Sequence, residues 1–393
     1  MKKTATSILL SIIIHFCFGQ TEFTFNQGGT KQINYFLVIS YENIKGKIIV
    51  GSVINGKTYR FILDTGAPMT ISSNLYDELK PTIINRLPIT DQSGKKDSLF
   101  VVSLKEITIG DITFTDIPTL VLNQTLLLDC FHADGFIGSN LLRNSIVQFN
   151  DASKTVTVTN DGNKLTLNRK QSSALFLTKN QSSPFIWIKL KGKKSAREQL
   201  LFDSGMDGLY ALSLSHYAAF EKYNILEILG KANGSYTIGA HGPANNAIQY
   251  KLRLSSMEIN SSKLNNITIR TTENNDSRIG SKLLENGIVT IDYKNRKFYF
   301  EPFFSKEINL LEKDFPVELI YRNNQVQVGI VWDTTLADKI KAGDQIVAID
   351  EISYENIDIC NLVTKESAKN KEKITLTTKN QAGEIQKTII EKK

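Results

Sequence analysis

The sequence is poor in the residues on which several protein classes depend. Its 393 residues include three cysteines and four histidines. Three cysteines exclude a disulfide-rich scaffold. The histidines form no His-Glu-x-x-His motif, and no Cys/His ligand spacing occurs. We therefore predict no metal site and no other cofactor.

The chain also lacks a strong charge of one sign. Lysine plus arginine exceed aspartate plus glutamate by 47 − 40 = 7, and no basic cluster is interleaved with aromatic residues. Nucleic acid is therefore not an expected partner. Neither a Gly-x-Ser-x-Gly nucleophile motif nor a phosphate-binding glycine loop is present. With 41% hydrophobic and 22% charged residues, a chain of this length is typical of a globular protein with two or three domains.

After Gln20 no long apolar run occurs, so we expect no membrane span. Before it, Lys2 and Lys3 precede an apolar run over residues 8–18 and the small residue Gly19. This order is typical of a secretory signal peptide, predicted here at residues 1–19, although a buried N-terminal strand or helix would also fit. We expect an exported protein in the periplasm, the cell envelope or the extracellular space.

Export would leave two cysteines, Cys130 and Cys360, in an oxidising compartment. The two residues fall in parts of the sequence that we assign to different domains. We therefore expect them to remain unpaired.

The body of the chain has the composition of consecutive β-strands. Residues 35–39, 47–53, 57–63, 99–109 and 155–159 are rich in β-branched and aromatic residues, and turn clusters separate several of them. Helical patterns are scarce in the first 300 residues and are clearest at 74–79 and 216–223. The sequence predicts a mainly β fold.

An internal repeat divides this β-rich region into two halves. Phe-Ile-Leu-Asp-Thr-Gly at residues 61–66 is matched by Leu-Leu-Phe-Asp-Ser-Gly at 200–205. Gly-Phe-Ile-Gly-Ser-Asn-Leu-Leu at 135–142 is matched by Arg-Ile-Gly-Ser-Lys-Leu-Leu at 278–284. The spacings from Asp to Gly agree, because 138 − 64 = 74 and 280 − 203 = 77. We infer a duplication, with lobes at residues 20–167 and 184–303 and a polar connection at 168–183.

Beyond Pro302 the sequence changes character. Charged residues become denser and glycine becomes rarer. We predict a separate module at residues 312–393.

Each half of the repeat places an aspartate at the end of an apolar strand. The Thr or Ser that follows offers a hydroxyl to the neighbouring backbone, and the Gly allows a tight turn. Two such units predict that Asp64 and Asp203 meet across a pseudo-two-fold axis. Because like charges at close range cannot both ionise, the pair would hold one proton. One carboxyl group would activate a water while the other protonates a carbonyl oxygen, with no fixed assignment of acid and base.

With these motifs the sequence resembles the pepsin and retropepsin class of aspartic proteases over residues 33–303. The resemblance implies a bilobed acid-protease fold with pseudo-two-fold symmetry and a catalytic dyad of Asp64 and Asp203. It also implies that the two hydroxyls lock the loops together beneath the dyad. The dyad-supporting residues would be Thr65, Gly66, Ser204 and Gly205.

The sequence departs from the pepsin pattern near the dyad. Pepsins place Ser or Thr after each triplet to bond the carboxylate, whereas this chain has Ala67 and Met206. Arg278 replaces an apolar residue in the second glycine block, where it would lie near the base of the dyad or reach solvent. The resemblance implies a β-hairpin flap with its turn at Ser93 and Gly94, but no tyrosine occurs between residues 77 and 110 to match the flap tyrosine of pepsins.

Residues 337–350 resemble a bacterial-type PDZ domain, in which a short helix precedes a Gly-Asp turn and a strand. The resemblance implies a small α+β domain that holds an extended peptide at a sheet edge. The carboxylate-binding loop would correspond to Phe315, Pro316 and Val317, although Pro316 offers no amide donor. The module would recruit a peptide ligand, or it would pack on the lobes as a rigid appendage.

These features lead to two hypotheses. The first is an exported, monomeric aspartic endopeptidase that cleaves a peptide or protein substrate, with the PDZ-like domain recruiting or positioning that substrate. The second is a catalytically inert protein of the cell envelope that uses the protease fold to bind peptides or to serve as a scaffold. A structure distinguishes them, because the dyad requires two carboxyl groups separated by about one water, on the order of 3 Å.

Overall fold

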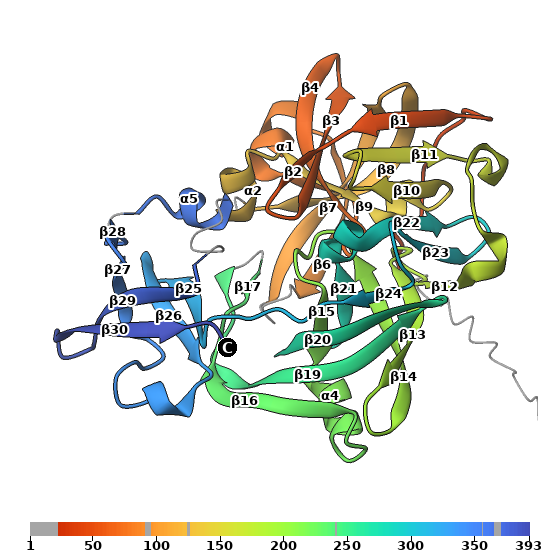
Figure 1. Cartoon of the computed structure of the whole chain (residues 1–393). Helices are drawn as coiled ribbons and strands as arrows, with labels where there is room; N and C mark the ends of the chain where they lie inside the picture. The colour runs from red at the N-terminus through yellow and green to blue at the C-terminus, as the bar shows by residue number, and fades with distance from the viewer. Residues whose placement is uncertain (1–22, 91–95, 124–125, 240–241, 356, 365–370) are drawn as a thin grey trace, which may run out of the picture.

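The computed structural model describes residues 23–90, 96–123, 126–239, 242–355, 357–364 and 371–393. The predicted signal peptide at residues 1–19 and the predicted flap turn with Ser93 and Gly94 lie outside these residues. Strands make up most of the secondary structure, which confirms the predicted mainly β class. Figure 1 shows a first lobe, a second lobe and a C-terminal unit (residues 312–393) that lies beside both.

The first lobe is built from strands that bury β-branched and aromatic residues. Phe61, Ile62 and Leu63, which precede the Asp-Thr-Gly turn of the repeat, are fully buried. The lobe contains β1 (Phe36–Ser40), β2 (Glu42–Ile44), β3 (Lys47–Ile54), β4 (Lys57–Asp64), β5 (Thr70–Ser72), α1 (Ser73–Leu79), β6 (Thr82–Thr90), β7 (Lys96–Ile109), β8 (Ile112–Leu122), α2 (Leu126–Phe131), β9 (Gly135–Gly138), α3 (Ser139–Leu142), β10 (Ile146–Asn150) and β11 (Thr155–Thr159).

The second lobe repeats this order with its own strand lengths. After the 3-10 turns η1 (Gly162–Lys164) and η2 (Arg169–Gln171), it contains β12 (Ser172–Leu177), β13 (Pro184–Lys191), β14 (Ser195–Asp203), β15 (Tyr210–Ser213), α4 (Leu214–Glu221), β16 (Leu226–Gly234), β17 (Ile238–Gly239), β18 (Gly242–Pro243), β19 (Ala247–Ile259), β20 (Ser262–Thr272), β21 (Arg278–Gly280), η3 (Ser281–Asn286), β22 (Gly287–Asp292), β23 (Lys297–Pro302) and β24 (Glu307–Asn309). Its buried core is continuous with that of the first lobe.

Matching strands pair in the same way in the two lobes. The strand that ends in aspartate pairs in parallel with the strand that ends in the repeated glycine, so that Asp64 lies opposite Gly138 and Asp203 opposite Gly280. The next strand along the chain pairs antiparallel with the same glycine strand, and a serine-capped helix follows it. The duplicated sequence therefore folds into a duplicated, bilobed structure.

A shared sheet joins the lobes in the strand order β1-β11-β10-β22-β23-β12. At its centre β10 pairs antiparallel with β22, and Gln148 lies opposite Thr290. These two positions are equivalent in the repeat, because 148 − 138 = 10 and 290 − 280 = 10. The pseudo-two-fold axis therefore passes between Gln148 and Thr290, where the side-chain amide donates a 3.0 Å hydrogen bond to the hydroxyl.

The predicted polar connection at residues 168–183 contains a strand. β12 lies within it and pairs with β23 on one side and with β13 on the other. This segment connects the lobes along the chain, and β12 also joins the shared strands to the rest of the second lobe's sheet.

The C-terminal unit is a small sheet with the order β25-β26-β27-β29-β30, to which β28 adds at β27. Its own cluster of buried apolar residues includes Val326, Val328 and Ile346. The unit contains β25 (Val317–Arg322), β26 (Gln325–Val331), η4 (Thr334–Leu336), β27 (Gln345–Ile349), β28 (Ile352–Ser353), α5 (Ile359–Thr364), β29 (Lys373–Lys379) and β30 (Ile385–Glu391).

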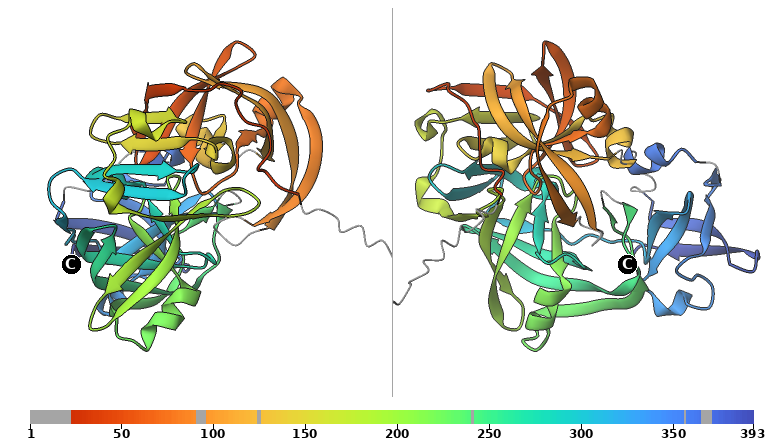
Figure 2. Two further views of the ribbon diagram at one scale, coloured as in Figure 1. Left: turned by 90° about the vertical axis from the view of Figure 1, so that its right-hand side faces the viewer. Right: turned by 180° about the vertical axis from the view of Figure 1, so that it is seen from behind.

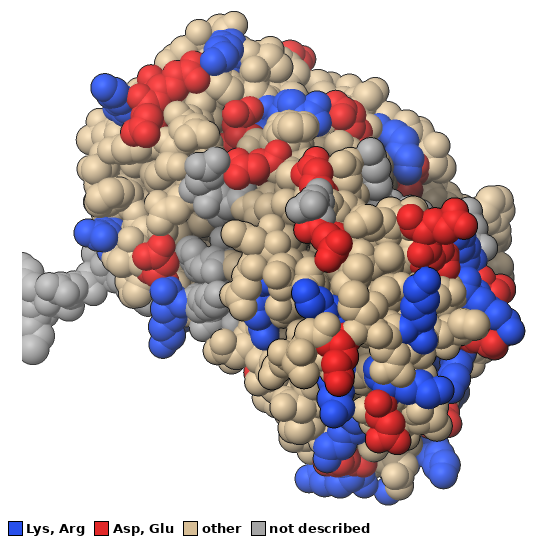
Figure 3. Space-filling model, turned by 90° about the vertical axis from the view of Figure 1, so that its left-hand side faces the viewer, with Lys and Arg blue, Asp and Glu red and all other residues tan. Residues whose placement is uncertain are grey.

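The C-terminal unit packs closely on the second lobe. The Ser235 amide, at the end of β16, donates to the Gly329 carbonyl on β26 at 3.2 Å. A Cβ on Gly234 would lie 2.1 Å from that carbonyl oxygen, so only glycine allows this approach. Nearby, Arg270 of the lobe forms ion pairs with Asp314 and Glu318. Figure 3 shows basic and acidic side chains interspersed over the face on which the C-terminal unit lies.

The C-terminal unit is also bonded covalently to the first lobe. A disulfide joins Cys130 on α2 to Cys360 on α5, so the expectation that these cysteines remain unpaired is wrong. The physical reason is the packing of α5 against α2, where Ile359 and Val363 contact an apolar cluster of the first lobe and bring the two cysteine Cα atoms to 4.6 Å. The right-hand view of Figure 2 shows the unit beside both lobes.

Candidate active site

Two matching turns, one at the end of β4 and one at the end of β14, bring Asp64 and Asp203 together at the lobe junction. Each turn lies against the repeated glycine of its own lobe. A Cβ on Gly138 would lie 2.4 Å from the Ala67 carbonyl oxygen, and one on Gly280 would lie 2.3 Å from the Met206 carbonyl oxygen. The glycine blocks of the repeat therefore pack directly against the two aspartate turns.

The hydroxyls of Thr65 and Ser204 join the two turns across the axis. The Thr65 amide donates to the Ser204 hydroxyl at 3.0 Å, and the Ser204 amide donates to the Thr65 hydroxyl at 3.0 Å. The hydroxyls in turn donate to the carbonyls of Phe202 and Leu63 at 2.6 and 2.8 Å. Both side chains are fully buried, so the reciprocal bonds hold the two turns in fixed positions.

The glycines after these hydroxyl residues lie against the opposite aspartate. A Cβ on Gly66 would lie 2.7 Å from the Asp203 carboxyl carbon, and one on Gly205 would lie 2.3 Å from the Asp64 carboxyl carbon. Each glycine amide also donates to the aspartate of its own turn, at 2.8 Å for Asp64 and 3.0 Å for Asp203. Glycine is thus required at both positions because the opposite carboxyl group occupies the space of a side chain.

The two carboxyl groups lie close to the axis, because each of them contacts the glycine of the opposite turn. Burial, followed by the negative charge of Asp203, raises the pKa of Asp64 to about 7. Asp64 is therefore protonated at acidic pH, next to the carboxyl group of Asp203.

The guanidinium of Arg278 lies on the dyad. Its Nη1 donates to Asp203 Oδ2 at 2.7 Å, on the oxygen that the Gly205 amide does not contact. The side chain is 21% exposed, and its buried Nε has no partner. From the sequence, the Arg278 side chain could lie near the dyad or reach solvent, and in the structure it lies at the dyad. The first lobe has Phe136 at the equivalent position, so the ion pair belongs to one lobe alone.

Two further groups near the dyad were not predicted from the sequence. Lys47 at the start of β3 donates through Nζ to the Gly205 carbonyl, and its charge acts to lower the pKa of Asp64. The buried hydroxyl of Tyr293 has no partner, and the Asp64 charge contributes to raising the pKa of this tyrosine. The hairpin offered a signal for Lys47, because Ile49 lies opposite Ile62 and extending this register by two residues leads from Lys47 to Asp64.

Each lobe has a long hairpin that follows its capped helix. In the first lobe β6 pairs with β7 from Thr82–Ser103 to Thr90–Lys96, so the hairpin continues up to the predicted flap turn, whose residues lie outside the described ones. In the second lobe β16 pairs with β19, and this hairpin lies against β26 of the C-terminal unit. The two hairpins are equivalent in topology but have different neighbours.

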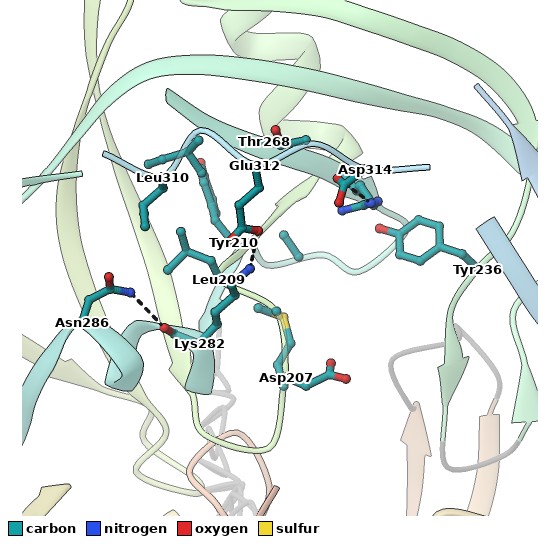
Figure 4. Close-up of a pocket in the computed structure, with 15 residues that line it drawn as sticks. Asp207, Leu209, Tyr210, Tyr236, Thr268, Lys282, Asn286, Leu310, Glu312 and Asp314 are labelled. Atoms are coloured by element: carbon teal, nitrogen blue, oxygen red, sulfur yellow. Dashed lines mark hydrogen bonds and ion pairs between the residues drawn. The ribbon is translucent and has the colours of Figure 1, made fainter. Parts of the chain in front are cut away.

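A cavity of about 250 Å³ lies beside the turn that follows Asp203. Figure 4 shows Asp207 and Leu209 on one side of it and Leu310 and Glu312, from the segment that leads to the C-terminal unit, on the other. Lys282 closes one end through a 2.6 Å ion pair with Glu312. The cavity therefore lies between the second aspartate turn and the segment that leads to the C-terminal unit.

The predicted peptide loop of the C-terminal unit is occupied by the chain itself. The backbone of Asp314 exchanges hydrogen bonds with Lys393, and the Pro316 carbonyl accepts one from the Trp332 amide. Phe315 is packed against the core of the unit, and Val317 begins β25. The loop therefore presents few donors to a terminal carboxylate.

Among the described residues, no group of three or more His, Cys, Asp or Glu side chains could hold a metal ion. In the same part of the chain, no helix is long and apolar enough to cross a membrane.

Residues 50–141 match a family model described as aspartyl protease. This segment contains Asp64, Thr65 and Gly66 together with the first glycine block. The match shows that this segment, which is less than half of the chain, is similar to aspartyl proteases. No curated protein matches the chain.

Solved structures with some likeness include the following. A retropepsin-like aspartic protease from Rickettsia conorii is 18% identical over 33% of this chain and 94% of its own, with a TM-score of 0.24. Conglutin gamma, a basic 7S globulin from lupine seeds, is 9% identical over 67% of this chain and 94% of its own, with a TM-score of 0.36. The protein edgp is 10% identical over the same shares, with a TM-score of 0.39.

Proposed function

We propose that the protein is an aspartic endopeptidase that hydrolyses peptide bonds with a water held between Asp64 and Asp203. The observation that carries this proposal is the meeting of two aspartates from duplicated turns, with reciprocal Thr65 and Ser204 bonds beneath them. Because one chain supplies both carboxyl groups, the site is complete in a monomer. No metal and no covalent intermediate take part in the proposed reaction.

In the proposed reaction, one carboxylate removes a proton from the water as its oxygen attacks the peptide carbonyl carbon. The other carboxyl group gives its proton to the carbonyl oxygen, which yields a neutral tetrahedral diol. The diol then collapses as the C–N bond breaks. The nitrogen receives the proton that came from the water, and a diol hydroxyl returns a proton to the dyad. The pair ends with the single proton with which it began.

This mechanism has a pH limit. The reaction needs one proton on the pair, and the pKa of Asp64 is raised to about 7. Activity is therefore expected over the acidic to near-neutral range and falls as the pH rises through about 7. Below that limit the pair keeps its proton.

The test is a peptide-cleavage assay on the full chain and on Asp64→Asn and Asp203→Asn. A peptide library read by mass spectrometry identifies a substrate, and kcat/KM is then measured on it. Each variant should lose activity by about 10⁴-fold or more, the order found when a catalytic residue of a protease is removed. Asp116→Asn, which changes an exposed carboxylate with a left-handed backbone that asparagine tolerates, is the control and should leave kcat/KM unchanged. Full turnover in either dyad variant would refute the mechanism.

We also propose that the protein is exported. The signal-like residues 1–19 support this, and so does the Cys130–Cys360 disulfide, because such bonds persist in oxidising compartments. The resulting location would be the periplasm, the cell envelope or the extracellular space.

For the C-terminal unit we propose a PDZ-like role in positioning the substrate. β25 lies at the edge of its sheet, which is where a PDZ domain adds an extended peptide. The loop at Phe315, Pro316 and Val317 lacks a proline amide, and the preceding Asp314 amide is bonded to Lys393. The expected ligand is therefore an internal extended segment and not a free carboxyl terminus.

A further inference from the structure

The two aspartates of the dyad differ in their hydrogen bonds and in their charged neighbours. Both accept a bond from a glycine amide of their own turn, and Asp64 Oδ1 also accepts one from the Ala67 amide at 3.0 Å. The other oxygen of Asp203 accepts from the Arg278 guanidinium at 2.7 Å, and the ion pair is largely buried, with side-chain exposures of 21% and 5%. Asp64 has no equivalent partner in the described residues, because Phe136 occupies the matching position of its own lobe. The two carboxyl groups therefore stand in different electrostatic surroundings.

The charged and titratable groups around the dyad come from five places in the fold. β4 and β14 supply the two aspartates, β21 supplies Arg278, and β3 supplies Lys47, whose Nζ donates to the Gly205 carbonyl. The turn after β22 supplies Tyr293, which is neutral over the working range because its pKa is raised by burial. Arg278 is thus the one cation among these groups that bonds directly to a carboxylate of the dyad.

We propose that Arg278 is a positioning residue that keeps Asp203 as the ionised member of the dyad and leaves the shared proton on Asp64. This inference rests on the proposed aspartic-peptidase function and assigns the roles within it. A guanidinium bonded to a buried carboxylate stabilises its charged form strongly, since the alternative is an unpaired buried cation. The neighbouring negative charge then favours the protonated form of Asp64.

The assignment fixes the direction of proton movement. Asp203 removes the proton from the attacking water, and Asp64 delivers its proton to the carbonyl oxygen of the substrate. In the collapse, Asp203 gives the water proton to the leaving nitrogen, while Asp64 recovers a proton from the diol. Arg278 does not touch the substrate in this scheme and acts through Asp203 alone.

Arg278 also compensates for a residue that the chain lacks. A hydroxyl after the aspartate turn would be the ordinary donor to this carboxylate in pepsin-like sequences, and here that position is Met206. The guanidinium supplies the missing hydrogen bond and adds a positive charge. A hydroxyl introduced at residue 206 would restore the bond without the charge, which separates the two contributions.

The experiment compares Arg278→Met with the wild-type chain over the full pH range of kcat/KM. Methionine keeps a long unbranched side chain, and the first lobe shows that an apolar residue is accommodated at this position. Without the cation, the acid limb of the profile should move to higher pH by about 1 to 3 units, the usual effect of a close opposite charge. On the acid side kcat/KM falls about tenfold for each unit of this movement, whereas the plateau changes far less.

Three companion variants sharpen the result. Arg278→Lys keeps the cation and should keep the acid limb near its wild-type position. Met206→Ser combined with Arg278→Met should supply a hydroxyl donor without a positive charge and leave the acid limb displaced. Arg197→Met, which removes an exposed cation from β14, the strand that carries Asp203, should leave the profile unchanged. Unmoved pH limits in Arg278→Met, or a rise in KM alone, would overturn the proposal.

A readout that does not need activity separates this proposal from the proposed function. Aspartate labelled with ¹³C at the carboxyl carbon gives one resonance per side chain, and Asp203→Asn identifies the relevant signal. In the wild-type chain that signal should stay at the ionised position to a lower pH than in Arg278→Met. The same titration in both proteins would overturn the role of Arg278. A chain with no peptidase activity at any pH but with the expected titration would instead refute only the enzymatic function.

Discussion

The two lobes repeat one topology but differ at matching positions. Where the first lobe has Phe136 beside its aspartate turn, the second has Arg278 bonded to the dyad. Where the first lobe has Leu75 bonded to the serine cap of its helix, the second has His216, whose ring bonds to the buried Glu198 at 2.6 Å. Both lobes share the features that hold the aspartates in position. Each charged residue near the dyad, by contrast, occurs in only one of the two lobes.

The lobes also differ in how their long hairpins are supported. β6 pairs with β7 alone among the described strands, whereas β16 pairs with β19 and packs on β26 of the C-terminal unit. Segments with few packed neighbours open at the lowest free-energy cost. We therefore expect the first hairpin to be the one that moves over a substrate and the second to form a fixed wall.

The largest effect is expected from removing the disulfide. Cys130→Ser with Cys360→Ser releases a link between residues 230 positions apart, and loss of such a link typically costs about 2–5 kcal/mol of unfolding free energy. Urea unfolding monitored by fluorescence measures this loss. The wild-type chain under reducing conditions is the control and should match the double variant. Equal stability of oxidised and double-variant chains would show that packing of α5 on α2 suffices.

A smaller and more local effect is expected from Gly329→Ala. A Cβ at this position would lie 2.2 Å from the Ser235 carbonyl oxygen, so β26 has to move away from β16, at a cost of about 1–3 kcal/mol. Amide hydrogen exchange should then increase in β16 and β19 toward the rate of β6 and β7. Gly51→Ala is the control, since its Cβ would make an ordinary 3.6 Å contact. Unchanged exchange in β16 would mean that the C-terminal unit does not support this hairpin.

The smallest effect concerns the histidine of the second lobe. The hydrogen bond to Glu198 raises the pKa of His216, and the charge of Asp276 acts in the same direction. A pKa raised on folding stabilises the fold fully below the unfolded value of about 6.5, and this contribution is lost as the pH rises through the folded value. His216→Gln should therefore destabilise the chain more at pH 5.5 than at pH 9. In a Glu198→Gln background this pH dependence should become much smaller, with the remainder due to Asp276, and its persistence at full size would exclude Glu198 as the main cause.

The sequence was sufficient to predict the duplication because its evidence is local and repeated. An apolar strand ending in Asp-Thr/Ser-Gly, followed at a matched spacing by a glycine block, determines which strands pair in parallel. The sequence predicted one reason for glycine at positions 66 and 205, the tight turn after each aspartate. The second reason, contact with the opposite carboxyl group, depends on the other lobe. Contacts across the axis could be predicted only because the internal repeat indicates a pseudo-two-fold arrangement.

Features that depend on a single long-range contact were not predictable in the same way. The spacing of Cys130 and Cys360 carries no information on their pairing, which results from α5 docking on α2. The backbone position of Arg278 followed from the repeat, but a long side chain can reach either solvent or the dyad. β12 was missed because just one of its six residues, Leu175, is buried, so the strand shows no alternating pattern.

The register at the centre of the shared sheet resembles that of an isologous dimer. Gln148 faces its own equivalent, Thr290, and the flanking pairs are related by the same two-fold operation. In an association of identical subunits, every residue on one side of such an axis has an identical copy on the other. A fused chain is free of this constraint, because each copy can change alone. The two aspartates can have unequal neighbours, a guanidinium at one of the matching positions and a phenyl ring at the other, only because each half has its own stretch of the sequence.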